Sequence, residues 1–233
     1  MNVGFRVFTR VARPPADLVA ALGRLETVYL SDAMNRFGGM DRNIRPADAA
    51  MRLAGPAVTV RVAPGDNLMV FRALEVAQPG DVIVIESRGF TQVAHWGDIT
   101  SMIAQTRRLA GMVTDGSVRD LKGICEVGLP VFSQPVTTPN GALKDGPGEV
   151  NVPVAVGNVP VLPGDIVVGD ANGVVVVPRR DAAAVLARAS AMAEAEAKKI
   201  QQIRSDKLEF PPAVRDGKSA DVYGALWDDS TEK

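Results

Sequence analysis

Three charged side chains in the middle of the chain have the chemistry to hold a small anion and a metal ion. Asp98 follows Gly97 in a Gly-Asp turn, and Arg119 and Asp120 are adjacent further along. Arginine keeps its charge and offers a planar fork that suits a carboxylate or an oxo-acid. The carboxylate of Asp120 suits Mg²⁺ or Mn²⁺, which take one or two protein oxygens and fill their other positions with water and substrate.

Two elements must position these side chains. A helix that begins just after Asp98 would direct its free backbone N–H groups, including those of Ile99 and Thr100, toward the Gly-Asp turn. An apolar strand over residues 111–114 would return the chain to the same edge and deliver the Arg-Asp pair there. We therefore expect a substrate carboxylate to bind at the start of this helix. The structural alternative is a group of surface salt bridges around the end of the strand.

The remaining reactive side chains give weaker indications. His95 is the only histidine, which excludes a histidine-rich zinc site within one chain. We expect it to be structural or to line a pocket, with a general base as the alternative. Cys125 has no candidate base nearby and is expected to be a small core residue. Glu194 and Glu196 are by default solvated charges on a C-terminal helix. The absence of GxGxxG, phosphate-loop, nucleophile-elbow and HExxH motifs argues against dinucleotide, nucleotide-hydrolase, serine-hydrolase and zincin chemistry.

The composition is that of an ordinary globular protein. The chain has 233 residues, 46% hydrophobic and 23% charged, which is enough to bury a sizeable core. A net charge of -1 and a pI near 5.9 give no electrostatic argument for nucleic acid or membrane partners. No apolar run reaches the roughly 18 residues that span a bilayer, and no signal-peptide pattern is present. Because the single cysteine also excludes an internal disulfide framework, we expect a cytoplasmic protein.

The pattern of apolar residues, glycines and prolines predicts helices mixed with strands. Helices are expected over 14–25, from a cap at Ser31 or Asp32 to Gly38-Gly39, from a cap at Asp66 to Ala77, and over 121–127. Strands are expected over 53–62, 82–85, 111–114 and 130–133, with a long surface loop over 135–149 and valine-rich strands between 150 and 177.

The last third of the chain is predicted to contain a hairpin and a long helix. Asn172-Gly173 between two valine-rich runs is a strong β-hairpin signal. A helix is expected over residues 181–206, with its apolar side chains spaced for one buried face: Val185, Leu186, Ala189, Met192, Ile200 and Ile203. Such a helix often packs on a neighbouring subunit. The tail after Phe210 is rich in Pro and Asp, and we expect it to dock on a surface or to be partly disordered.

Together these motifs resemble the RraA-like family, which contains divalent-metal pyruvate aldolases and the regulator of ribonuclease E activity. The aldolase branch carries an Asp, twenty residues, then Arg-Asp, and Asp98 and Arg119-Asp120 have this spacing. Asn158 departs from the pattern, because members usually carry a second glycine there. The resemblance covers roughly residues 20–205 and rests on residues 30–34, 55–60, 65–68, 78–82, 97–98, 114–120, 163–165 and 169–178.

The resemblance implies how substrate would bind. Gly97, Asp98, Ile99 and Thr100 would hold the pyruvate half of a small 2-oxo acid, with the Ile99 and Thr100 amides on its carboxylate. Arg119 would contact the keto or hydroxyl oxygen.

The resemblance also implies a divalent metal cofactor. Mg²⁺ is the first expectation, and Mn²⁺ and Co²⁺ are the alternatives. Asp120 would bind the metal directly, and Asp98 would act through a water molecule at the metal. A glutamate from the C-terminal helix of an adjacent subunit would complete the site. Glu194 and Glu196 are both in range, with Glu196 preferred.

The fold implied is a compact α/β sandwich of the swivelling β/β/α type with a long C-terminal helix. One domain would span residues 1–205, followed by an extension over 206–233. The assembly implied is a homotrimer or homohexamer with active sites at subunit interfaces.

The activity implied is that of a lyase. It would cleave a 4-hydroxy-2-oxo acid such as 4-hydroxy-4-methyl-2-oxoglutarate to pyruvate through a metal-stabilised enolate, and would also decarboxylate oxaloacetate. One rival is a non-catalytic regulator that binds a ribonuclease or helicase. Another is an enzyme for a different oxo-acid on the same scaffold.

Overall fold

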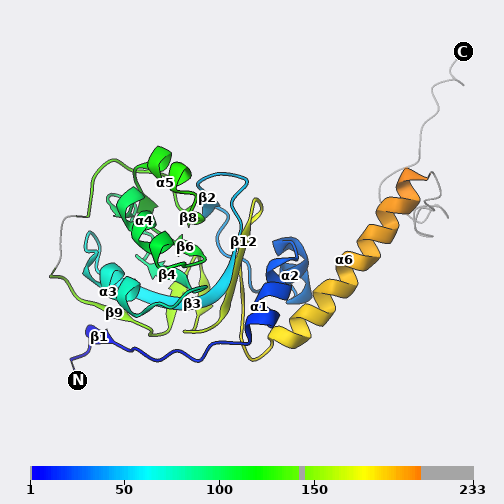
Figure 1. Cartoon of the computed structure of the whole chain (residues 1–233), viewed down its shortest axis with the longest axis horizontal. Coiled ribbons are helices and arrows are strands. Elements are labelled where there is room, and N and C mark those ends of the chain that lie inside the picture. Colours follow the sequence, from blue (N-terminus) through cyan, green and yellow to red (C-terminus); the bar gives the residue numbers. More distant parts are fainter. Residues whose placement is uncertain (1, 142–144, 206–233) are drawn as a thin grey trace, which may run out of the picture. The chain divides into compact units, whose positions relative to one another are not determined.

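The computed structural model describes residues 2–141 and 145–205, which form many strands, several short helices and one long helix (Figure 1). The chain divides into two units, Met1–Met192 and Ala193–Lys233. The helices are α1 (Ala16–Gly23), α2 (Thr27–Ala33), α3 (Leu68–Val76), α4 (Asp98–Thr106), α5 (Leu121–Val127) and α6 (Ala182–Arg204). The strands are β1 (Phe5–Val7), β2 (Arg45–Pro46), β3 (Leu53–Val62), β4 (Val82–Glu86), β5 (Ala94–Trp96), β6 (Gly111–Thr114), β7 (Ser117–Val118), β8 (Val131–Ser133), β9 (Gly148–Val150), β10 (Val154–Val156), β11 (Val159–Val161), β12 (Ile166–Asp170) and β13 (Gly173–Val177).

A nine-stranded sheet lies at the centre of the first unit. Strands β3, β4, β6 and β8 lie side by side in that order and run parallel. All residues of β4 and β6 are buried, as expected for strands that are covered on both faces and read as continuous apolar runs. Helices α3, α4 and α5 cover one face of these strands (Figure 1).

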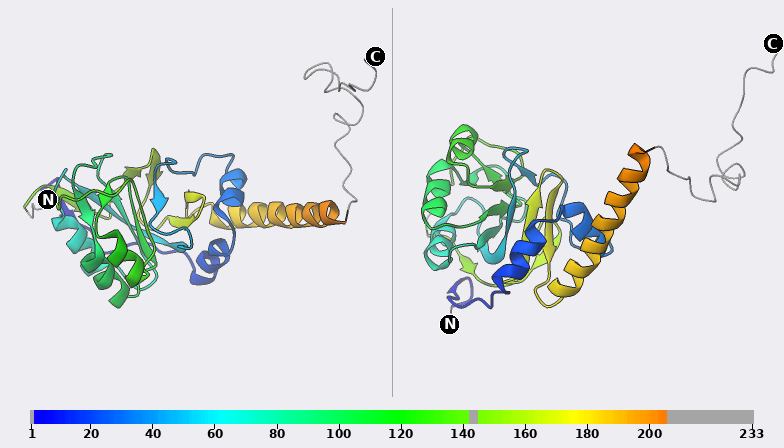
Figure 2. Two further views of the ribbon diagram at one scale, coloured as in Figure 1. Left: turned by 90° about the horizontal axis from the view of Figure 1, so that it is seen from above. Right: turned by 45° about the vertical axis from the view of Figure 1, so that its right-hand side comes forward.

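The long strand β3 joins this parallel region to an antiparallel hairpin in the same sheet. Residues 53–56 of β3 pair antiparallel with β12, whereas residues 57–61 pair with β4. Strands β12 and β13 form the predicted hairpin, in which Asp170 lies opposite Gly173. Helices α1 and α2 lie on the side of this hairpin that faces away from α3, α4 and α5 (Figure 2). The predicted α/β fold is confirmed.

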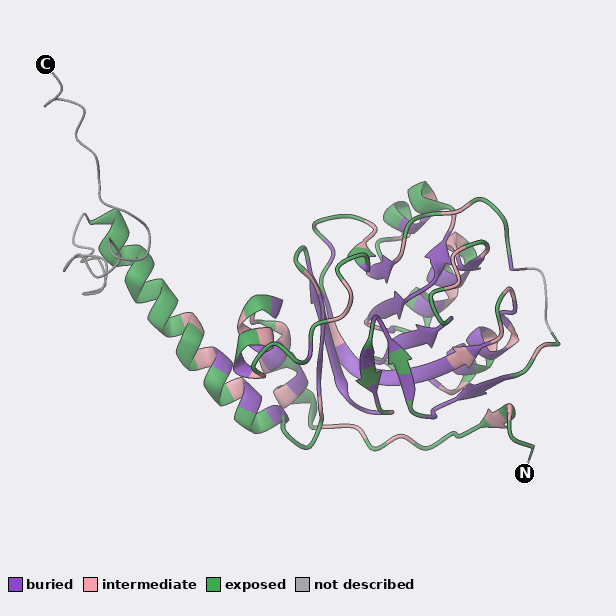
Figure 3. Cartoon of the chain, turned by 180° about the vertical axis from the view of Figure 1, so that it is seen from behind, coloured by how far each residue is buried: buried purple, intermediate pink, exposed green. Residues whose placement is uncertain are grey.

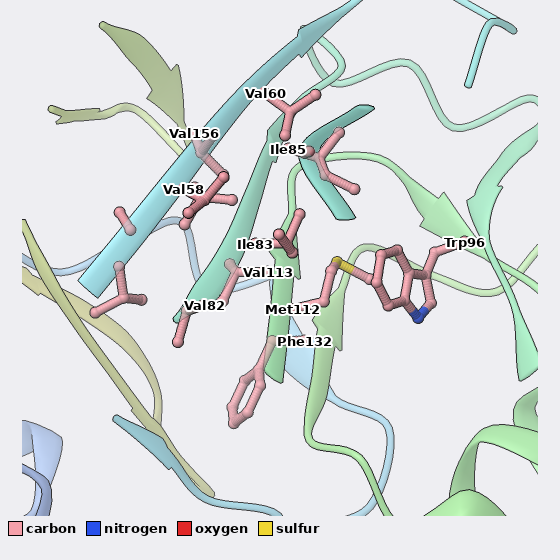
Figure 4. Close-up of a cluster of buried hydrophobic side chains, with 14 of the residues drawn as sticks. Val58, Val60, Val82, Ile83, Ile85, Trp96, Met112, Val113, Phe132 and Val156 are labelled. Atoms are coloured by element: carbon pink, nitrogen blue, oxygen red, sulfur yellow. The ribbon is translucent and has the colours of Figure 1, made fainter. Parts of the chain in front are cut away.

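Two hydrophobic clusters stabilise the first unit. The larger lies among the parallel strands and α3, and Figure 4 shows part of it, with Trp96 at one edge. The smaller joins β12 and β13 to α1, α2 and the first turns of α6, through Leu22, Leu30 and Val185 among others. Full burial of one such side chain contributes about 1.5–3 kcal/mol. Figure 3 shows how completely the central strands are buried.

Most predicted elements are confirmed, but the second helix begins earlier than its predicted cap. Because α2 spans Thr27–Ala33, Ser31 and Asp32 lie in its last turns and do not cap it. The N–H and hydroxyl of Thr27 instead donate to the carboxylate of Asp170, at 2.8 and 2.7 Å. This anchor lies 143 residues away and gives no local signal in the sequence.

Two smaller findings concern the second half of the chain. The loop predicted over 135–149 ends earlier, because Gly148–Val150 forms β9 and pairs with β1 and β3. Gly157 and Asn158 form the two-residue turn between β10 and β11, both with left-handed backbone, at φ 56° and 65°. Asparagine tolerates this conformation better than most residues, so replacement of the usual glycine preserves the turn.

The single buried face predicted for the long helix is only partly correct. In α6, Val185 and Ala189 are buried, but Met192, Ile200 and Ile203 are 37%, 39% and 52% exposed within one chain. None of the described helices, α6 included, is long and apolar enough to cross a membrane. The tail after Phe210 lies outside the described residues, and the predicted boundary at residue 205 stays a prediction.

Candidate active site

A short parallel pair of strands, β5 and β7, brings the two halves of the predicted site together. Ala94 lies opposite Ser117 and Trp96 opposite Val118. Just beyond this pair, the Arg119 N–H donates to the Trp96 carbonyl oxygen at 3.1 Å. The chain leaves β5 into α4 and leaves β7 into α5, so the Gly-Asp turn and the Arg-Asp pair lie at the same edge.

The start of α4 is fixed by its own side chains. The Thr100 hydroxyl accepts from the Gly97 N–H at 2.8 Å and donates to the Gly97 carbonyl oxygen at 2.9 Å. The buried Ser101 hydroxyl also donates to this oxygen, at 2.9 Å, and accepts from the Trp96 indole N–H at 2.7 Å. These bonds hold the Gly-Asp turn rigidly against the core.

Asp120 begins α5 in a left-handed conformation with φ 57° and ψ 41°. This conformation is uncommon outside glycine, although aspartate and asparagine adopt it more readily than other residues. Its carboxylate rests against Gly97, where a Cβ would lie only 2.7 Å from Asp120 Oδ2. The Arg119 Nε lies 3.2 Å from the same oxygen, with both side chains more than a third exposed. Such a pair contributes little to stability.

Asp98 has a similar packing arrangement on the other side of the turn. A Cβ on Gly123 would lie 2.7 Å from Asp98 Cβ, so α5 approaches the aspartate closely only because a glycine is present. The Ile99 N–H donates to Asp98 Oδ1 at 2.6 Å. The expectation that this N–H is free is therefore wrong, and a bound carboxylate would have to take the place of Asp98.

A pocket of about 130 Å³ joins these groups. Its small volume suits a small ligand. It is lined by the predicted residues Gly97, Asp98, Ile99, Thr100, Arg119 and Asp120, together with Asn67, Phe71, His95, Trp96 and Asn140. A larger pocket of about 610 Å³ has an entirely different lining that includes Phe37 and Leu162.

Asn67, Phe71 and Asn140 line the pocket but were not predicted as site residues. Asn67 could have been predicted, because it follows Gly65-Asp66 in one of the segments that carry the family resemblance. Asn67, and not the predicted Asp66, is the N-cap of α3, although the Asp66 carboxylate accepts from the Leu68 N–H at 2.8 Å. Asn140 gave no signal, because it lies in a loop with no readable motif.

His95 lines this pocket, which is one of the roles predicted for it from the sequence. The imidazole is 1% exposed, and neither ring nitrogen has a hydrogen-bond partner among the described residues. Burial lowers the pKa of His95 below its usual value, and the nearby negative charge of Asp66 opposes this shift only in part. The side chain is therefore neutral at pH 7, with one N–H donor and one acceptor nitrogen.

Asp115 supports the turn behind His95. Burial raises the pKa of Asp115, and hydrogen bonds from Ser87 and from the Gly89 N–H oppose the shift. The Ser87 N–H donates to Asp115 Oδ1 at 2.7 Å, which ties the end of β4 to the end of β6. Asp115 thus serves to position β7 and the Arg-Asp pair that follows it.

Three remaining predicted residues lie elsewhere on the chain. Glu194 and Glu196 are exposed on α6, within the second unit, and their part in a shared site stays a prediction. Cys125 is exposed, so the expectation of a core residue is wrong. On the short helix α5 it is the neighbouring Ile124 that faces the core.

The fold agrees with what comparison with known proteins shows. The chain belongs to the RraA-like family, whose model, described as Aldolase/RraA, matches residues 27–176.

Individual relatives carry two kinds of name. The chain is 35% identical over 152 residues to the 4-hydroxy-4-methyl-2-oxoglutarate aldolase of Thermus thermophilus, which covers 65% of this chain and 92% of that protein. It is 39% identical over 173 residues to a Halalkalibacterium halodurans protein named "Putative 4-hydroxy-4-methyl-2-oxoglutarate aldolase". That match covers 74% of this chain and 82% of the relative. The solved structure of Streptomyces coelicolor RraAS2, described as an unusual member of the RNase ES inhibitor RraA protein family, is similar with a TM-score of 0.72. That match has 28% identity and covers 82% of this chain and 100% of that one.

Proposed function

We propose that this chain is a divalent-metal-dependent carbon–carbon lyase. It cleaves a 4-hydroxy-2-oxo acid of the 4-hydroxy-4-methyl-2-oxoglutarate type to pyruvate, and it decarboxylates oxaloacetate. The observation that carries the proposal is the convergence of Asp98, Arg119 and Asp120 on one small pocket. Relatives named as aldolases support a lyase at the level of the family.

The donors of the pocket fit a hard divalent ion. Mg²⁺ takes one or two carboxylates and keeps several waters, so Asp120 as a ligand and Asp98 as a hydrogen-bonding neighbour would suffice. Within residues 2–141 and 145–205, no three His, Cys, Asp or Glu side chains cluster closely enough to hold a metal alone. This agrees with a site that substrate and a second subunit complete. When bound, the ion would supply Lewis-acid stabilisation of negative charge on the substrate oxygens.

The residues of the chain supply the remaining chemistry. Breaking the bond next to a pyruvoyl group leaves negative charge on the pyruvate half as an enolate. Arg119 stays cationic and would stabilise this charge, and the loss of one such donor typically costs about 3–4 kcal/mol. A substrate carboxylate at the Ile99 and Thr100 amides would release Asp98 from the Ile99 N–H. Asp98 would then accept, by way of water, the proton of the C4 hydroxyl.

The decisive experiment measures pyruvate release from oxaloacetate and from 4-hydroxy-4-methyl-2-oxoglutarate, with Mg²⁺ and after chelation. Arg119→Ala should lower the rate about 100- to 1000-fold. Asp120→Asn is preferable to Asp120→Ala, because asparagine tolerates the left-handed backbone at φ 57° and only the charge is lost. This variant should lose the response to Mg²⁺.

The matched control is Arg72→Ala, which removes an exposed arginine that pairs with Glu75 outside the pocket. It should leave turnover unchanged. If the wild-type protein releases no more pyruvate with Mg²⁺ than the Arg119 and Asp120 variants do, the lyase proposal is wrong.

A non-catalytic regulator is the second candidate function. The description of the S. coelicolor relative as a member of a ribonuclease-inhibitor family favours it. A regulator has no need of an aspartate held in a left-handed backbone beside an arginine. Binding of a ribonuclease that is unchanged in the Arg119→Ala and Asp120→Asn variants, together with absence of turnover, would support this alternative.

A further inference from the structure

His95 is the one pocket side chain whose placement the reaction outlined above does not explain. Its ring is 1% exposed, yet neither Nδ1 nor Nε2 has a hydrogen-bond partner among the described residues. A buried polar group without a partner costs folding free energy, and such groups in native proteins call for an explanation. His95 also lines the pocket that contains Arg119 and Asp120.

The surroundings of the ring leave one nitrogen for a ligand. Nδ1 faces the turn after β6, because a Cβ built on Gly116 would lie 3.2 Å from it. The acidic neighbour Asp66 is already engaged, since its two carboxylate oxygens accept from the N–H groups of Leu68 and Gly146 at 2.8 and 2.7 Å. Nε2 is therefore the nitrogen that remains to meet a molecule in the pocket.

The proposed roles of the other residues indicate which part of the substrate this is. The amides at the start of α4 take the carboxylate of the pyruvate half, and Arg119 takes its keto oxygen. The polar group left over is the distal carboxylate of the departing half. A neutral imidazole can donate its N–H to such a group.

We propose that His95 is a specificity-determining residue, which hydrogen-bonds the departing half of the oxo-acid through Nε2. This inference rests on the proposed function and deepens it. A pocket built to hydrogen-bond a substrate group discriminates strongly against analogues that lack that group. His95 would therefore favour oxo-acids with a distal carboxylate over those with an alkyl chain.

Because His95 is the only histidine of the chain, its imidazole can be observed without assignment. The protein is labelled with ¹⁵N and titrated, in the presence of Mg²⁺, with 2-oxopentanoate and separately with 2-oxoglutarate, which has the same five-carbon chain but ends in a second carboxylate. The amide signals of Ile99 and Thr100 report occupancy of the pyruvate half. We expect both compounds to shift these amides, and only 2-oxoglutarate to shift Nε2 of His95.

Three variants identify the atom that acts. His95→Leu keeps a buried side chain without polar atoms, His95→Gln places an amide near the position of Nε2, and His95→Asn places one near Nδ1. We expect His95→Leu to raise the KM for 4-hydroxy-4-methyl-2-oxoglutarate about ten- to a hundredfold, and His95→Gln but not His95→Asn to recover most of it. The affinity for 2-oxopentanoate, which has no distal carboxylate, should be unchanged. Thr59→Val, which removes a buried hydroxyl on β3 outside the pocket, is the stability control.

Each outcome decides the matter. A silent His95 while the Ile99 and Thr100 amides shift with 2-oxoglutarate overturns the inference, as does an equal shift with 2-oxopentanoate. So do variants that all lose stability like Thr59→Val without any change in the KM. A His95 shift in a protein that has no metal-dependent turnover keeps this contact and refutes the lyase. If no signal moves with either compound, both proposals fail.

Discussion

Both carboxylates of the pocket rest directly on the backbone of a glycine. Asp120 lies against Gly97, and Asp98 lies against Gly123, each closer than a Cβ would allow. The acidic side chains therefore gain their positions from missing side chains on the facing element. Close packing against these glycines restricts where each carboxylate can lie, so its position does not depend on a long-range ion pair.

The buried imidazole should make the stability of the protein depend on pH. The folded pKa of His95 is lowered, so between that value and the unfolded value of about 6.5 the unfolded chain binds more protons. The free energy of unfolding should therefore fall as pH drops below about 6.5, by at most about 1.4 kcal/mol per pH unit from this residue. Denaturant unfolding of the wild type and of His95→Asn between pH 5 and 7 measures the difference.

The difference in slope between the two proteins can be assigned to His95, because the variant contains no other histidine. The raised pKa of Asp115 acts with the opposite sign, favouring the folded state at lower pH, but it is present in both proteins. Equal slopes for the two proteins would contradict the prediction.

At the scale of elements, the site depends on how α4 begins. The Gly97 carbonyl oxygen accepts from the hydroxyls of both Thr100 and Ser101, and the indole of Trp96 binds Ser101. The first turn of the helix is thus fastened to β5 by side chains. This arrangement fixes the position of the residues at the start of α4 that line the pocket, Asp98 among them.

Ser101→Ala tests this anchoring. The substitution leaves the Trp96 N–H buried without its partner, which should cost about 1–3 kcal/mol of unfolding free energy. Thr106→Ala at the other end of α4 removes an exposed hydroxyl that donates to Ile103 at 2.7 Å, and should cost less. Denaturant midpoints of the two variants measure the difference. If Ser101→Ala costs no more than Thr106→Ala, the side chains at the start of α4 do not anchor it.

The sequence predicted the elements well and their contacts poorly. The strand at 53–62 and the helix at 121–127 follow from local apolar patterns, and both are found with these bounds. The true start of α2 was missed because its anchor, Asp170, is remote in the chain. Asp98 and Arg119-Asp120 were found because a fixed spacing links them. Asn140 and the engaged N–H of Ile99 depend on three-dimensional packing, which no short motif records.

At the scale of the whole molecule, α6 has apolar side chains that are exposed among the described residues. Met192, Ile200 and Ile203 continue the spacing of the buried Val185 and Ala189. A helix face of this kind favours contact with another protein surface. Glu194 and Glu196 lie on the same stretch, so a second copy that receives this helix would also receive its carboxylates.

Subunit mixing tests whether the site is shared. Arg119→Ala subunits co-assembled with Glu196→Ala subunits should regain part of the turnover, because some sites then combine an intact pocket with an intact glutamate. Arg119→Ala mixed with Asp120→Asn should regain none, since both changes lie on the same side of the site. The mixture with Glu194→Ala distinguishes the two glutamates. No recovery with either glutamate variant would contradict a shared site.

The left-handed backbone at Asp120 also bears on how this scaffold evolves. The two residues that adopt this conformation at least as comfortably, asparagine and glycine, are each one base change away from either aspartate codon. The charge that a metal would need can thus be deleted without straining the fold. A gene copy that takes this step would lose the proposed chemistry and keep the backbone of this turn, which would be a short mutational path from the proposed lyase to the alternative regulator.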